Sequence, residues 1–134
     1  MKRIITILLF MLCVYSIAST QVVKLSTLQA FSDGSVITIR WNTEDESNVT
    51  NFVIERRVST SGAFIELTSI NPKGSSLYEF VDKTAFRSTA TLYQYQIKVK
   101  FSNSNSEQIF GPISVSHSVN SVKRTWGSIK AMFR

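Results

Sequence analysis

The feature that most constrains the fold is a strict alternation of apolar and polar side chains along residues 92–101. The apolar set is Tyr93, Tyr95, Ile97, Val99 and Phe101, and the polar set is Gln94, Gln96, Lys98 and Lys100. A period of two places successive side chains on opposite faces of an extended strand. This segment therefore predicts a β-strand with one buried and one solvent-exposed face.

Six other segments show a similar pattern and are separated from one another by residues that favour turns. They are residues 22–30, 35–42, 51–58, 63–70, 77–81 and 109–119. Seven short strands in this stretch predict an all-β fold, a seven-stranded immunoglobulin-like β-sandwich. The last segment contains Gly111-Pro112, which indicates an edge strand, because proline cannot donate a hydrogen bond to a sheet.

Large apolar residues occupy the inward-facing positions of these segments. We expect the structural core to contain Trp41, Phe52, Tyr78, Phe80, Tyr93, Tyr95 and Ile97. The outward positions of segments 51–58 and 92–101 carry Glu55, Arg57, Lys98 and Lys100. We expect opposite charges to pair across these two strands.

Several motifs along the strands carry a family resemblance. They are Trp41 on the second strand, Phe52-Val53-Ile54-Glu55-Arg56 on the third, Tyr78-Glu79-Phe80-Val81-Asp82 on the fifth, Tyr93-Gln94-Tyr95-Gln96-Ile97 on the sixth and Gly111-Pro112-Ile113-Ser114 on the seventh. With them, residues 22–119 resemble a fibronectin type III domain of the kind found in bacterial exported proteins. The resemblance implies that Tyr93 is the tyrosine-corner residue, whose hydroxyl bonds to the chain upstream. It implies a spacer or binding surface rather than one particular function.

The two ends of the chain do not fit the strand pattern, so we divide it into residues 1–20, 21–120 and 121–134. Lys2-Arg3, an apolar run over residues 4–15 and small residues at 16–18 are typical of a cleaved signal peptide. The apolar run is short for a membrane anchor, because crossing a bilayer takes about 20 residues. A lipoprotein signal at Cys13 is disfavoured by the bulky Leu12 before it. We expect a secreted or extracytoplasmic protein, in the periplasm or at the cell surface.

The formal charge of +6 belongs to the ends of the chain. The excess positive residues are Lys2, Arg3, Lys123, Arg124, Lys130 and Arg134. Residues 21–121 carry nine basic and nine acidic side chains. Nucleic acid is therefore disfavoured as a partner, because phosphate binding needs clustered Lys and Arg on the folded domain.

The tail, residues 121–134, changes to the 3.6-residue period of a basic amphipathic α-helix, with Ser121 as its N-cap. So short a helix is marginal alone and needs a surface to lie against. That surface is the flank of the sandwich, a lipid surface or a partner groove. The residues expected to make the contact are Lys123, Arg124, Trp126, Ile129, Lys130, Met132, Phe133 and Arg134.

Catalytic and metal-binding signals are sparse in this sequence. His117 is the only histidine, and we expect it at the rim of the sandwich rather than in a catalytic site. Three consecutive acidic residues, Glu44-Asp45-Glu46, favour a solvated loop over a Ca²⁺ site, because they cannot converge on one ion. Asn48-Val49-Thr50 is a sequon that matters only in a cell that glycosylates exported chains. We expect no enzyme, and no cofactor, metal or small-molecule substrate.

These features predict an exported, non-enzymatic binding module whose tail docks it to an envelope component or a larger protein assembly. The alternative is a peripheral membrane-surface protein that the tail holds on anionic lipid. A small hydrolase on a sandwich scaffold is the third choice, because the sequence displays no catalytic constellation.

Overall fold

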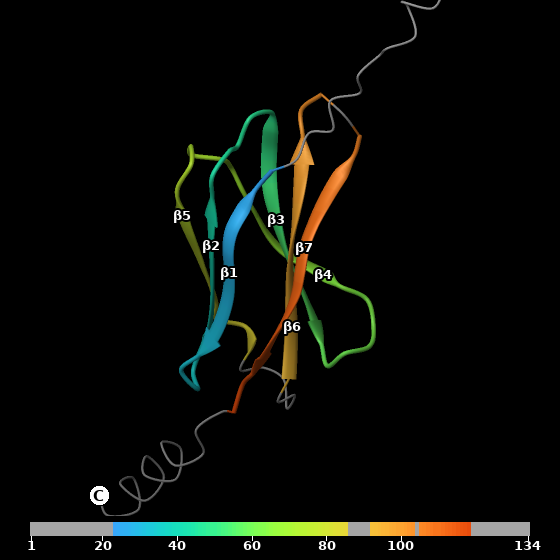
Figure 1. The fold of residues 1–134 in the computed structure, drawn as a ribbon. Coiled ribbons are helices and arrows are strands. Elements are labelled where there is room, and N and C mark those ends of the chain that lie inside the picture. The colour runs from blue at the N-terminus through green and yellow to red at the C-terminus, as the bar shows by residue number, and fades with distance from the viewer. Residues whose placement is uncertain (1–22, 86–91, 104, 119–134) are drawn as a thin grey trace, which may run out of the picture.

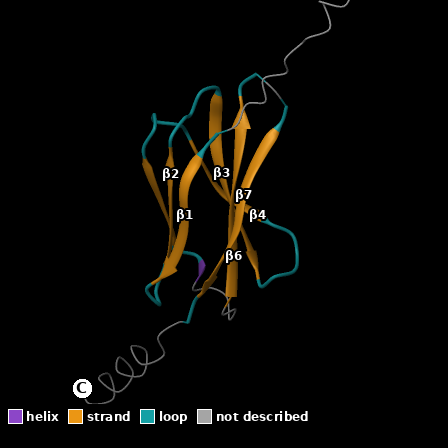
Figure 2. Ribbon diagram, in the orientation of Figure 1, coloured by secondary structure: helices purple, strands orange, loops and turns teal. Residues whose placement is uncertain are grey.

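The computed structural model describes residues 23–85, 92–103 and 105–118, which form two antiparallel sheets that face each other (Figures 1 and 2). The strands are β1 (Leu25–Ser32), β2 (Ile37–Thr43), β3 (Val49–Val58), β4 (Ile65–Ile70), β5 (Leu77–Asp82), β6 (Leu92–Phe101) and β7 (Glu107–Ser116). One sheet has the order β1-β2-β5, and the other has the order β4-β3-β6-β7. The described part of the chain is thus an all-β sandwich of seven strands, as the alternation predicts.

The strand boundaries differ from the predicted ones by up to three residues, because cross-strand pairing decides where a strand ends. β3 begins two residues early, directly after Asn48, whose left-handed φ of 62° closes the preceding loop. β7 starts at Glu107 rather than at residue 109, since Glu107 pairs with Lys100 of β6. β1 and β4 start three and two residues later than predicted.

β7 is an edge strand, as Gly111-Pro112 predicts, but this dipeptide lies inside the strand rather than interrupting it. The register between β6 and β7 shifts opposite it, between Tyr95 and Ile97. Gly111 has a φ of 104°, and a Cβ atom there would lie 2.9 Å from the carbonyl oxygen of Tyr95. Both the backbone conformation and the close approach of β6 therefore require glycine at this position.

The core lies between the two sheets and contains the aromatic residues expected there. Trp41, Phe52, Tyr78, Tyr93, Tyr95 and Ile97 are buried, whereas Phe80, on the edge strand β5, is only half-buried. The indole of Trp41 stacks on the ring of Tyr78, with 5.1 Å between the ring centroids. The ring of Phe52 meets the indole edge-on at 6.2 Å. Because Phe52 belongs to β3 and the other two rings to β2 and β5, this cluster ties the sheets together.

β1 and β7, the edges of different sheets, lie side by side along one seam of the sandwich (Figure 1). At one end of the seam, the Val23 amide donates to Oε1 of Gln108 at 2.9 Å, and Nε2 of Gln108 donates to the Val23 carbonyl at 3.2 Å. At the other end, Oγ of Ser32 lies 2.6 Å from Nδ1 of His117. Side-chain contacts therefore close a seam that would otherwise expose two strand edges.

Candidate functional site

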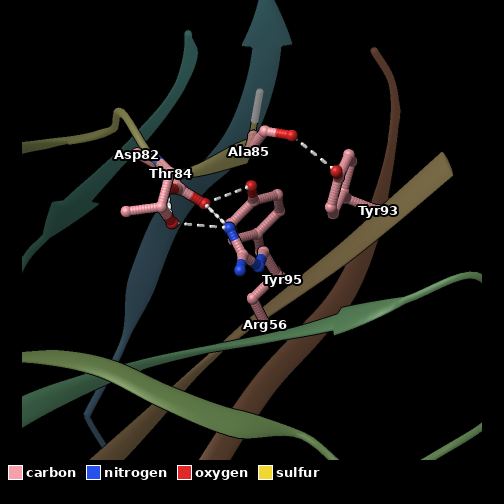
Figure 3. Close-up of polar contacts among 6 residues, drawn as sticks. All are labelled: Arg56, Asp82, Thr84, Ala85, Tyr93 and Tyr95. Carbon is pink, nitrogen blue, oxygen red and sulfur yellow. Dashed lines mark hydrogen bonds and ion pairs between the residues drawn. The ribbon is translucent and has the colours of Figure 1, made fainter. Parts of the chain in front are cut away.

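A group of polar side chains around the buried Asp82 joins the two sheets at the end of β5 (Figure 3). Nη1 of Arg56 lies 2.6 Å from Oδ2 of Asp82, and the Tyr95 hydroxyl donates to the same oxygen at 2.8 Å. The amide and hydroxyl of Thr84 donate to Oδ1 of Asp82 at 2.8 and 2.7 Å. Arg56 also donates to the Thr84 hydroxyl at 2.9 Å. One carboxylate thus collects donors from β3, from β6 and from the residues after β5.

The electrostatics of this group follow from its burial. Burial by itself raises the pKa of Asp82, but the hydrogen bonds from Thr84 and Tyr95 and the charge of Arg56 outweigh it, so the pKa lies below its ordinary 3.8. Burial and the neighbouring Asp82 carboxylate raise the pKa of Tyr95 far above its usual range. Asp82 is therefore ionised and Tyr95 protonated at neutral pH. Both oxygens of the carboxylate already accept hydrogen bonds, so it is poorly placed to act as a general base.

Tyr93 lies beside this group and makes the contact that the family resemblance implies. Its hydroxyl donates to the carbonyl oxygen of Ala85 at 2.7 Å (Figure 3), in a fully buried hydrogen bond to the chain upstream. The guanidinium of Arg56 lies 5.4 Å from the centroid of the Tyr93 ring, within the range of a cation–π contact. Tyr93 thus fixes the residues after β5 against β6.

Glu46 lies at the other end of the sandwich, in the acidic loop that the sequence predicts to be solvated. Its side chain is bonded to other residues instead. Its Oε1 accepts hydrogen bonds from Thr43 and, at 2.6 Å, from the Tyr78 hydroxyl, and its Oε2 accepts one from the Gly74 amide at 2.8 Å. Glu46 therefore braces the β2–β3 loop against the β4–β5 loop, because buried polar partners lie within its reach. Burial and, after it, the hydrogen bond to Glu46 raise the pKa of Tyr78 to about 12.

The other two members of the acidic cluster are exposed and paired locally. Nζ of Lys24 lies 2.7 Å from Glu44, and Asp45 accepts hydrogen bonds from the amide and hydroxyl of Ser47. Within the part of the chain that the structure describes, no group of three or more His, Cys, Asp or Glu side chains is arranged to hold a metal ion.

The outer face of the four-stranded sheet is more enclosed than the alternation predicts. Glu55, Gln94 and Gln96 occupy outward positions, yet each is at most 9% exposed. Nζ of Lys98 lies 2.9 Å from Oε1 of Glu55, and Nε2 of Gln96 donates to Oε2 of the same carboxylate at 2.6 Å. The prediction of a solvated face is wrong here, because neighbouring strands supply long polar side chains that cover one another.

The expected charge pairing across β3 and β6 is realised between Glu55 and Lys98, but not at Arg57. Nε of Arg57 donates to Oε1 of Gln94 at 2.8 Å, and Nε2 of Gln94 donates to Ser114 at 2.9 Å. The pKa of Lys98 is raised chiefly by its hydrogen bond to Glu55. For Glu55, burial works against ionisation, but Lys98 and Gln96 outweigh it and lower the pKa. The polar side chains of this face thus form two bonded groups, one around Glu55 and one around Gln94.

His117 is buried, with an exposed fraction of 1%, and follows the inward register of Val115 near the end of the last strand. Its Nδ1 contacts Ser32, and its ring meets the ring of Tyr93 edge-on with 6.0 Å between the centroids. The period of two places His117 on the inward face, and the contact with Ser32 across the seam between β1 and β7 contributes to its burial. The imidazole therefore links the end of β7 to β1.

The contact surface predicted on the tail lies outside the described residues, as does the predicted signal peptide. The predicted contact residues of the tail are Lys123, Arg124, Trp126, Ile129, Lys130, Met132, Phe133 and Arg134. In residues 23–85, 92–103 and 105–118, there is no helix of the length and apolar character needed to cross a bilayer.

No protein-family model matches this chain, and neither a curated protein nor a solved structure does. What the protein does must therefore be inferred from its own residues. Sequence reasoning missed the group around Asp82 and the role of Glu46, because their partners lie on different strands. A signal was available in Asp82, the last residue of the Tyr78-Glu79-Phe80-Val81-Asp82 motif that contributes to the resemblance.

Proposed function

We propose that this chain is an exported, non-enzymatic binding module with a fibronectin type III-like sandwich. The strand order supports the fold type, because β4 pairs with β3, whereas the fourth strand of a constant-type immunoglobulin domain pairs with the fifth. The hydrogen bond from Tyr93 to Ala85 supports it as well, since it matches a tyrosine corner. The leader over residues 1–20 is the basis for export to an extracytoplasmic location.

The non-enzymatic part of the proposal is supported by three acidic side chains whose carboxylates are engaged within the sandwich. Asp82, Glu46 and Glu55 each accept hydrogen bonds through both carboxylate oxygens from other parts of the sandwich. A carboxylate that acts as a general acid or base must be free to meet a substrate. A domain whose carboxylates are engaged in internal contacts is better suited to present a stable surface to a partner than to use those carboxylates in catalysis.

Attachment is assigned to the tail, residues 121–134, which carries four basic residues and no acidic one. An apolar stripe with Trp126, Ile129 and Phe133 is suited to a groove on an envelope protein or a larger assembly. The same combination of apolar and basic residues favours, as a second candidate, the surface of an anionic membrane.

A pull-down from the envelope of the native host tests this proposal. The full chain and a chain ending at Asn120 are compared, with Ile109→Ala as the control, because Ile109 is an exposed apolar residue of the sandwich. The proposal expects the full chain and Ile109→Ala to capture the same envelope protein and the truncated chain to lose it. Equal capture by all three chains would refute the role of the tail.

Sedimentation with lipid vesicles separates the two candidates. If the target is a protein, neither anionic nor zwitterionic vesicles carry the full chain down. If the target is the membrane, anionic vesicles sediment the full chain but not the chain ending at Asn120, and added salt weakens the binding.

A further inference from the structure

We infer that Asn48 is a site of N-linked glycosylation. Asn48-Val49-Thr50 is the single Asn-X-Ser/Thr motif in the chain, and its middle residue is not proline. The inference rests on the export part of the proposed function, because this motif is used in exported proteins.

The three residues of the motif alternate between exposed and buried positions where β3 begins. Val49 is 8% exposed and belongs to the core cluster, whereas Asn48 and Thr50 are exposed. The Asn48 amide and the Thr50 hydroxyl, the two groups that define the motif, therefore both lie on the solvent side of the chain.

Asn48 holds its loop together only through its backbone. Its carbonyl oxygen accepts hydrogen bonds from the Ser102 amide at 2.8 Å and from the Ser102 hydroxyl at 3.3 Å. Its side chain, like that of Thr50, makes no hydrogen bond or ion pair with the residues that the structure describes. The φ of 62° is a left-handed conformation that asparagine tolerates better than most residues. A glycan on Nδ2 would therefore break no contact of the sandwich.

The position of Asn48 also leaves the rest of the surface free. The β2–β3 loop lies at the end of the sandwich opposite to the end at which β7 finishes (Figure 1). A glycan attached in this loop is therefore separated from the end of β7 by the length of the sandwich. Glycosylation at Asn48 would therefore leave the end of β7 uncovered.

The modification is a transfer from a glycan carried on a lipid diphosphate. The Asn48 amide nitrogen forms a bond to the anomeric carbon of the glycan, and the bond from that carbon to the phosphate oxygen breaks. The lipid diphosphate leaves, and the amide gives up one proton to a base of the transferase. No atom is oxidised or reduced.

Intact-mass spectrometry of the protein isolated from its native host tests this inference. We expect a mass above that of the bare chain by one glycan, removable by a peptide N-glycosidase. Asn48→Gln and Thr50→Ala should lose the added mass completely, and Thr50→Ser should retain it, because serine keeps the hydroxyl. Asn105→Gln is the matched control, since Asn105 is an exposed asparagine with glutamate two positions later. This control should keep the added mass.

The same spectra distinguish failure of this inference from failure of export. A bare chain that has lost its leader overturns glycosylation and leaves export standing. A bare chain that retains residues 1–20 overturns both glycosylation and removal of the leader. Added mass that persists in Asn48→Gln overturns the assignment to Asn48.

Discussion

Tyr95 of β6 donates a hydrogen bond to Asp82 of β5 over 2.8 Å and so joins the two sheets through their buried faces. Arg56 of β3 reaches the same carboxylate oxygen at 2.6 Å. The side chain of Asp82 is 1% exposed and that of Arg56 is 12% exposed, so water is a poor substitute for either partner. Removing this one carboxylate should therefore weaken the contact between the sheets.

Asp82→Asn should lower the free energy of unfolding by about 3–5 kcal/mol, because it leaves the charge of Arg56 largely buried and unpaired. Urea denaturation followed by circular dichroism measures the change. Glu79→Gln is the control, because the Arg40–Glu79 pair also spans 2.6 Å but both side chains are nearly half exposed. Its cost should be about 0–1 kcal/mol. Similar small costs for both variants would show that the buried pair does not stabilise the fold.

Acid should destabilise the sandwich through the same carboxylate. The folded protein holds the pKa of Asp82 below 3.8, so the unfolded chain binds protons more readily than the folded one. The stabilisation by ionised Asp82 is fully present above the pKa that this carboxyl has in the unfolded chain. It is lost as the pH falls through the lower pKa that the carboxyl has in the folded protein. Urea titrations from neutral pH to about pH 2 should show a steeper loss for the wild type than for Asp82→Asn. Parallel curves would contradict the assignment to Asp82.

Alkali should destabilise the protein through Tyr78, whose pKa is raised from 10.0 to about 12. The folded state keeps the phenolic proton longer than the unfolded state, so this stabilisation is complete below pH 10 and is lost between pH 10 and about 12. Tyrosinate absorbance and circular dichroism, followed together, report ionisation and unfolding. Tyr78→Phe should be less stable at neutral pH and lose stability less steeply in that range. If Tyr78→Phe lost stability as steeply as the wild type over this pH range, a group other than Tyr78 would cause the alkaline unfolding.

Tyr93→Phe isolates the hydrogen bond to Ala85. The variant keeps the ring in the core but leaves a buried carbonyl without its donor, which should cost about 1–3 kcal/mol. Thermal and urea unfolding measure the cost. A variant as stable as the wild type would show that the phenol does not fix the residues after β5.

Lys123→Glu combined with Arg124→Glu tests the charge of the tail. If attachment is through an acidic partner or lipid surface, this variant should bind more weakly, and the difference should shrink at high salt. If the tail serves an external target, the melting temperature should stay within about 1–2 °C, because charges that make no contact with a core contribute little to stability. Unchanged binding at low salt would exclude an electrostatic role for these two residues.

Much of the sandwich can be predicted from local pattern. The alternation along residues 92–101 predicts β6 and its inward-facing Tyr93, Tyr95 and Ile97, all of which are buried. Burial of Gln94 and Gln96 cannot be predicted in this way, because a period of two assigns faces and does not say what covers each face. Strands β3 and β7, distant in sequence, provide the covering side chains Glu55, Arg57 and Ser114.

The sequence by itself determined the strand segments, the aromatic core and the neutral balance of charge in residues 21–121, because each depends on residue type and spacing along the chain. Only the tertiary structure decided which polar side chains became internal partners. Asp82 meets Arg56 from 26 residues away, and Glu46 meets Tyr78 from 32 residues away. Such contacts depend on which strands lie side by side and on what remains shielded from water once the sheets face each other. Folding therefore turned two ordinary loop and strand-end acids into the groups that hold the sandwich at its opposite ends.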